Sequence, residues 1–124
     1  MVLIIGGAYQ GKLDFAKSTF DLSESDIFTC TGGEIDFSRR CIDHIEEFTL
    51  WCVQSGVDAV EFFRSCREQW QDSILICEDI SAGVVPLGAD MRAWRQTNGL
   101  LCRYLSGEAA QGSRLFCGLE ERLK

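Results

Sequence analysis

Hydrophobic positions along this chain alternate between short unbroken runs and longer stretches in which they recur every three or four residues. Val2–Ile5 and Ser73–Cys77 are the strongest runs, and they indicate strands buried on both faces of a parallel sheet. Two weaker segments, Asp26–Cys30 and Ser113–Cys117, are also predicted as strands. Gly118 is expected to close the last of them.

The stretches between these runs have the spacing of amphipathic helices. Helices are predicted over Lys12–Phe20, over Ile35–Gln54, from Asp58 onward and over Ala89–Leu105. Strands and helices therefore alternate, which predicts an α/β fold with a mostly parallel sheet flanked by helices. Because the chain has 124 residues and neither a repeat nor a linker, we expect one domain over residues 1–124.

The first strand runs directly into a glycine-rich loop that ends in lysine, with the pattern G-x-x-x-x-G-K. A strand before such a loop and a helix after it are typical of a P-loop, so the predicted fold is P-loop NTPase-like. Glycines let the backbone N–H groups turn inward around phosphate oxygens, and the lysine reaches the β- and γ-phosphates. Leu13 stands where the pattern has the Ser or Thr that holds Mg²⁺. The predicted nucleotide-binding residues of this loop are Gly6, Gly7, Ala8, Tyr9, Gln10, Gly11, Lys12 and Leu13.

An acidic pair, Glu78 and Asp79, follows the second strong apolar run. Mg²⁺ prefers oxygen ligands, and P-loop enzymes commonly hold it with a carboxylate near such a strand end. We therefore expect Glu78, with Asp79 beside it, to bind Mg²⁺. The alternative is that the pair only caps the end of a strand.

The composition of the chain argues against several classes of binding partner. The net charge is −7, which argues against nucleic acid because its phosphates repel an acidic surface. No apolar run approaches the roughly 20 residues of a membrane span, and we expect no signal peptide. The chain has seven cysteines and no C-x-x-C pair, so we expect no zinc site. The thiols are expected to be reduced and the protein cytoplasmic. Cys77 and Cys117 are expected to act as small hydrophobic residues.

A more specific resemblance comes from residues 76–86, Ile-Cys-Glu-Asp-Ile-Ser-Ala-Gly-Val-Val-Pro. Together with Met91-Arg92-Ala-Trp94-Arg95, Gly99 and the ending Leu115–Lys124, this segment resembles the adenosylcobinamide kinase / adenosylcobinamide-phosphate guanylyltransferase family. The similarity covers residues 1–17 and 73–124. It implies a cytoplasmic enzyme of cobalamin biosynthesis, expected as a homo-oligomer, that takes GTP or ATP and a cobinamide-type corrinoid.

In that family the enzyme phosphorylates adenosylcobinamide and then transfers GMP, through a histidine, onto the new phosphate. The resemblance implies catalytic roles for Lys12 and Glu78, and for His44 as the only histidine available to carry GMP. His44 is otherwise read as a surface residue on an acidic helix. Arg92 and Arg95, three residues apart, either clamp nucleotide phosphates or lie on a solvated helix face.

Two functions therefore stay open. The first is a kinase and guanylyltransferase of this type. The second is a catalytically impaired module that binds a nucleotide or a corrinoid without turnover. Leu13 favours the second, and so does Leu87-Gly88, where the family usually has Glu-Asn.

Overall fold

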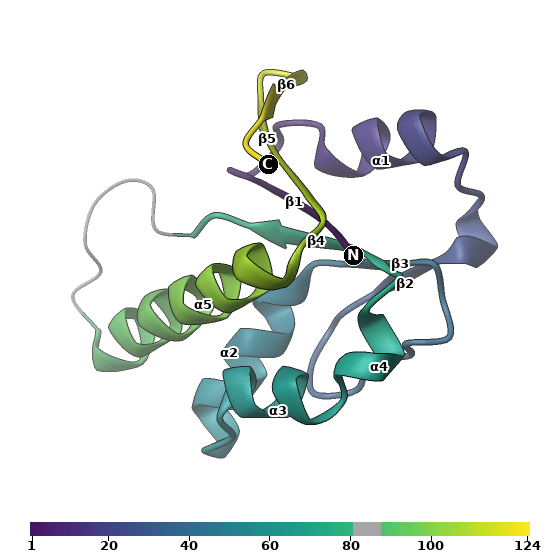
Figure 1. Cartoon of the computed structure of the whole chain (residues 1–124). Coiled ribbons are helices and arrows are strands. Elements are labelled where there is room, and N and C mark those ends of the chain that lie inside the picture. Colours follow the sequence, from purple (N-terminus) through teal and green to yellow (C-terminus); the bar gives the residue numbers. More distant parts are fainter. Residues whose placement is uncertain (81–87) are drawn as a thin grey trace.

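A computed structural model describes residues 1–80 and 88–124. Within them, a mixed sheet is flanked by helices on both faces (Figure 1). The strands are β1 (Val2–Gly6), β2 (Ile27–Thr29), β3 (Cys41–Asp43), β4 (Ile74–Glu78), β5 (Gln111–Phe116) and β6 (Leu119–Arg122). The helices are α1 (Lys12–Phe20), α2 (Ile45–Ser55), α3 (Ala59–Ser65), α4 (Arg67–Trp70) and α5 (Ala89–Glu108), with a short 3₁₀ turn at Glu24–Asp26.

The order of strands across the sheet is β2-β3-β4-β1-β5-β6. The first five strands pair in parallel, and β6 pairs with β5 in the antiparallel sense. The expected α/β fold with a mostly parallel sheet is confirmed. The strand before the glycine-rich loop is central, as its apolar run predicted, since it lies between β4 and β5.

Two apolar clusters cover the two faces of the sheet. Ile4 packs with Ala16 of α1 on one face, called here the α1 face. Leu3 packs with Phe48 and Leu101, from α2 and α5, on the other, called the α5 face. Alternate residues of β1 therefore enter opposite clusters, which requires the unbroken hydrophobic run seen in the sequence.

The helix predicted over Ile35–Gln54 is wrong in its first half. The structure has strand β3 there, and α2 begins only at Ile45. Cys41 and Ile42 are completely buried between neighbouring strands, so tertiary pairing overrides the local helical spacing. The second difference is β6, a strand that the sequence pattern did not predict.

Residues 81–86, which belong to the segment that carries the family resemblance, lie outside the described residues, as does Leu87. Among the described helices, none combines the length and the apolar character needed to cross a bilayer.

Candidate functional site

The glycine-rich loop joins the end of β1 to the start of α1. A Cβ atom on Gly6 would lie 2.7 Å from the Leu115 carbonyl oxygen, so only glycine lets β1 and β5 approach this closely. Gly11, at the N-terminus of α1, has a left-handed φ of 88°. Tyr9 also has a positive φ, 59°, and is fully exposed at the tip of the loop. The Lys12 Nζ atom donates a hydrogen bond of 2.6 Å to the Gly7 carbonyl, so the lysine folds back across the loop.

Gln10 attaches this loop to the turn between β5 and β6. Its Oε1 atom accepts a hydrogen bond from the Cys117 N–H at 2.5 Å, and its carbonyl accepts one from Gly118 at 3.0 Å. The loop is therefore anchored at both ends and also in its middle.

A cavity of about 570 Å³ opens in front of the loop. One wall is the loop and the first turn of α1. The other wall comes from the ends of β3 and β4, because the carboxyl ends of parallel strands meet at one edge of the sheet. The described lining residues are Ala8, Tyr9, Gln10, Gly11, Lys12, Leu13, Asp14, Asp43, His44 and Glu78. The structure thus brings the three predicted catalytic residues, Lys12, His44 and Glu78, to the same cavity.

His44 is held by two neighbouring carboxylates. It does not lie on a helix, as the sequence reading had it, but precedes α2 with a left-handed φ of 57°. Its Nδ1 atom lies 2.7 Å from the Glu46 Oε2 atom, and its backbone N–H donates to the Asp43 Oδ1 atom at 2.8 Å. The Nε2 atom lies 3.7 Å from the Asp43 Oδ2 atom. The imidazole is therefore oriented through its hydrogen bond at Nδ1, while Nε2 makes the longer contact with Asp43.

Glu46 connects His44 to the end of β4. This carboxylate is buried, and its second oxygen, Oε1, accepts the Glu78 N–H at 2.9 Å. The Glu78 carbonyl accepts a hydrogen bond of 3.0 Å from the Asn98 side chain, and the Glu46 carbonyl accepts one of 2.8 Å from the Trp94 indole. Both donors belong to α5, so that helix holds the acidic wall of the cavity from behind.

Burial and crowding of negative charge change the proton affinities of this wall. Burial raises the pKa of Asp43, and Glu46 adds to the effect, against the opposing charge of His44. Burial and Glu46 likewise raise the pKa of Glu78, while Lys12 and His44 oppose the change. Burial alone would lower the pKa of His44, but the hydrogen bond to Glu46 and the charges of Asp43, Glu46 and Glu78 outweigh it and raise the pKa.

Five predicted site residues are not among the described residues that line this cavity: Gly6, Gly7, Asp79, Arg92 and Arg95. Gly6 and Gly7 line a neighbouring hollow together with Asp79. Asp79 donates its N–H to the Gly6 carbonyl at 2.7 Å and lines two hollows beside Ile5, because consecutive residues at a strand end diverge. Arg95 lines one of those hollows with Asp79. Arg92 is exposed in the first turns of α5, and neither arginine is among the described residues that line the cavity at the loop.

Sequence reasoning missed Asp43 and Glu46. Asp43 ends a short apolar run, Cys41-Ile42, just as Glu78 ends β4. That signal was available, but the long helix predicted across this region concealed it. Glu46 carried no signal of its own, since its role depends on Glu78, which is 32 residues away in sequence.

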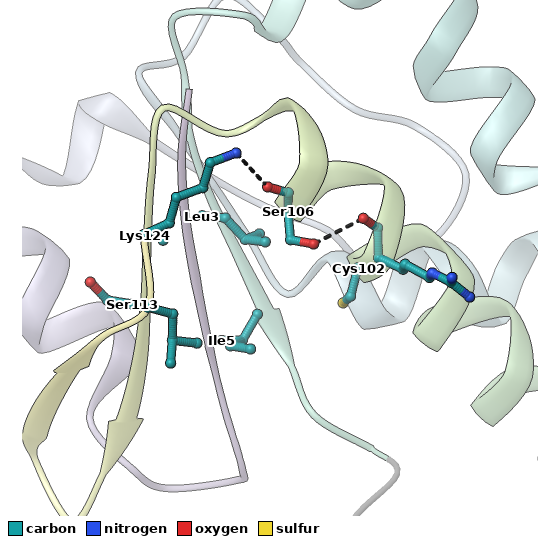
Figure 2. Close-up of a pocket in the computed structure, with 9 residues that line it drawn as sticks. Leu3, Ile5, Cys102, Ser106, Ser113 and Lys124 are labelled. Carbon is teal, nitrogen blue, oxygen red and sulfur yellow. Dashed lines mark hydrogen bonds between the residues drawn. The ribbon is translucent and has the colours of Figure 1, made fainter.

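A second hollow, of about 500 Å³, lies between α5 and the β1–β5 part of the sheet (Figure 2). Its apolar lining residues include Leu3, Ile5 and Cys102. At its rim the Lys124 Nζ atom donates to the Ser106 carbonyl at 3.1 Å. None of the predicted catalytic residues lines it.

In the described part of the chain, no group of three or more histidine, cysteine or acidic side chains is arranged to hold a metal ion. No protein-family model matches this chain, and no curated protein matches it.

Proposed function

We propose that this protein binds a nucleoside triphosphate, GTP or ATP, at the glycine-rich loop and transfers a phosphoryl or guanylyl group from it. One observation carries the proposal: Lys12, His44 and Glu78, from three separate segments, line a single cavity in front of the loop. The resemblance to the adenosylcobinamide kinase / guanylyltransferase family selects a cobinamide-type alcohol, or its phosphate, as the acceptor in cobalamin synthesis.

The loop supplies the positive end of the site. The backbone N–H groups at the start of α1 face incoming phosphate, helped by the helix dipole. Lys12 donates to the Gly7 carbonyl in the structure, and it would exchange this bond for one to the β- or γ-phosphate. These donors stabilise the charge that develops on the transferred group.

The acidic wall fits a hydrated Mg²⁺ ion bound together with the nucleotide. Mg²⁺ keeps several waters and takes one or two carboxylates plus substrate phosphates, so it does not need a preformed cluster of protein ligands. Glu78 is the residue of the predicted Glu78–Asp79 pair that lines the cavity. The ion would neutralise phosphate charge, and Glu78 would orient it without help from Leu13, which has no hydroxyl group.

His44 would act through Nε2. In the phosphoryl step it accepts the proton of the acceptor hydroxyl as that oxygen attacks the γ-phosphate, and the nucleoside diphosphate leaves. In the guanylyl step Nε2 attacks the α-phosphate of GTP, an N–P bond forms, and pyrophosphate leaves. The corrinoid phosphate then takes GMP from the histidine and restores the free imidazole.

Leu13 favours the second candidate function, a module that binds nucleotide or corrinoid without turnover. Its side chain is apolar and packs against the cluster on the α1 face, so one expected Mg²⁺ ligand is absent. The enzyme must bind nucleotide and turn it over, whereas the module binds nucleotide or corrinoid and turns over neither.

Binding and turnover should therefore be measured together. We expect calorimetry to detect Mg²⁺-dependent binding of GTP or ATP, and Lys12→Ala to weaken it at least tenfold. Lys17→Ala is the matched control, because Lys17 lies on the same helix but pairs with Glu24. Consumption of nucleotide in the presence of cobinamide supports the enzyme, whereas binding without consumption supports the module. If neither nucleotide binds, the enzyme is wrong, and if cobinamide does not bind either, the module is wrong as well.

A further inference from the structure

The outer edge of β6 is a free sheet edge within the described part of the chain, since β5 is the only described strand that pairs with β6. It lies at the end of the sheet in Figure 1, and all four of its residues are exposed. An uncovered edge strand presents unpaired N–H and C=O groups and is a template for another strand. The sequence of β6 indicates which strand that is.

The turn before β6 determines which backbone groups point outward. Cys117 and Gly118 both have positive φ, 51° and 77°, as in a two-residue hairpin turn. In such a hairpin the flanking residues, Phe116 and Leu119, form a hydrogen-bonded pair, and the direction of the backbone groups alternates from there. Leu123 fits this alternation, since its N–H donates to the Gly112 carbonyl at 2.8 Å. The backbone groups of Glu120 and Arg122 therefore face away from β5.

Side chains on β6 also divide between the two faces of the sheet. Glu120 and Arg122 lie opposite Leu115 and Ser113, two buried residues of the α1 face, and the Ser113 hydroxyl donates to Glu120 at 2.6 Å. Leu119 and Glu121 lie on the α5 face, opposite Phe116 and Arg114. Leu123, which lines the hollow of Figure 2 together with Leu3, lies on that face as well.

These two alternations make the strand complementary to itself. Two copies related by a two-fold axis perpendicular to the sheet would pair β6 with β6 in the antiparallel sense and keep each face continuous. One register places Glu120 opposite the partner's Arg122, and Arg122 opposite the partner's Glu120, as hydrogen-bonded pairs. The neighbouring symmetric registers place Glu120 opposite the partner's Glu120, or Arg122 opposite the partner's Arg122, and like charges directly opposite each other are unfavourable.

The same register also joins apolar side chains on the α5 face. It places Leu119 opposite the partner's Leu123, and the two-fold axis repeats this pair on the other side of the interface. In the single chain the Leu119 and Leu123 side chains are 71% and 55% exposed. Glu121 meets the partner's Glu121 at the centre. Each of these carboxylates lies 3.8 Å from the Nε atom of its own Arg114, which reduces their repulsion.

We propose that two copies of this chain associate through β6 in this register and form one continuous sheet across the two-fold axis. The partner is a second copy, because oppositely charged and apolar side chains then face each other at the same time. The strand is short, so the dimer belongs to the small, concentration-dependent class of interfaces. It does not depend on the function proposed for the loop.

Charge reversal tests the register. Wild-type protein, followed by sedimentation equilibrium over a range of concentrations, should shift from 13.9 kDa towards twice that mass. Arg122→Glu places two glutamates opposite each other across the interface, and Glu120→Arg places two arginines opposite each other, so each variant should remain monomeric. Arg67→Glu, on α4, is the control and should dimerise like the wild type.

The two monomeric variants should then pair with each other. An equimolar mixture of Glu120→Arg and Arg122→Glu restores opposite charges at both positions, so a heterodimer is expected, and the double variant should dimerise by itself. Circular dichroism identifies any variant that fails to fold, and recovery in the mixture shows that both partners are folded. Three results would each overturn the proposal. The first is wild-type protein that stays monomeric at every concentration. The others are an Arg122→Glu dimer as stable as the wild-type dimer, and a mixture that forms no heterodimer.

Discussion

The orientation of His44 depends on Glu46, two residues further along the chain. The buried carboxylate accepts from Nδ1 on one side and from the Glu78 N–H on the other, so it fixes both residues with one side chain. It also adds negative charge beside the imidazole, which raises the pKa of His44. A base or nucleophile must be unprotonated, so this pKa sets the acid limit of any reaction in which His44 takes part.

We therefore expect kcat/KM for nucleotide turnover to rise with pH through a pKa above the ordinary histidine value of about 6.5. Glu46→Gln keeps the shape and removes the charge, so the pKa of His44 falls and the rising limb moves to lower pH. Glu47→Gln is the matched control, since the hydrogen bond and ion pairs of the imidazole go to Asp43 and Glu46 and not to the Glu47 side chain. A profile that does not move in Glu46→Gln would contradict the role of His44, whereas a uniform loss of rate would indicate only a structural role for Glu46.

At the scale of elements, the contact between β1 and β5 determines where the loop begins. Gly6 is the last residue of β1, and its Cα faces the backbone of Leu115 rather than a side chain that can move. We expect Gly6→Ala to reduce the free energy of unfolding by about 1–3 kcal/mol, the usual cost of overpacking.

Gly99 provides a control for which the free energy of unfolding should change in the opposite direction. It lies inside α5, and a Cβ atom there would meet nothing within 4 Å. Gly99→Ala should therefore stabilise the protein by about 0.5–1 kcal/mol, because alanine favours the helix. Urea denaturation of both variants measures the two changes. If Gly6→Ala were as stable as the wild type, β1 and β5 would not approach as closely as the structure has them.

The sequence predicted elements well where their signals are local. The helix over Lys12–Phe20 is confirmed with the same boundaries, because a glycine precedes it and its apolar residues have helical spacing. β3 was missed, since three residues are too few to establish a period and their burial depends on β2 and β4. β6 was missed for a related reason: its exposed, charged residues belong to a strand only because the Cys117–Gly118 turn returns the chain to β5.

At the scale of the whole molecule, the order of the strands in the sheet brings the cavity residues together, and the sequence pattern did not predict that order. Lys12 and Glu78 could be placed together in advance, since each follows a strong apolar strand. His44 reaches the same cavity only because β3 is inserted next to β4. The acidic character of the wall arises in the same way, from Asp43 and Glu46 meeting Glu78 across the sheet.

The burial of the cysteines provides a test of the fold as a whole. All seven lie in the described residues and are unpaired. Five are buried, Cys102 is half-buried, and Cys117 is exposed, which corrects the expectation that Cys117 fills an apolar site. Burial raises the pKa of Cys30 and Cys41 to about 12 and that of Cys52 to about 11, so their reactive thiolate forms are scarce near neutral pH.

We therefore expect a chromogenic disulfide reagent at pH 8 to react rapidly with one thiol of the native protein, Cys117, and more slowly with Cys102. The other five should react only as fast as the molecule unfolds, because they lie in clusters on both faces of the sheet. Cys117→Ser should remove the rapid phase and leave the others unchanged. Rapid reaction of three or more thiols without denaturant would mean that the two apolar clusters do not close as the structure has them.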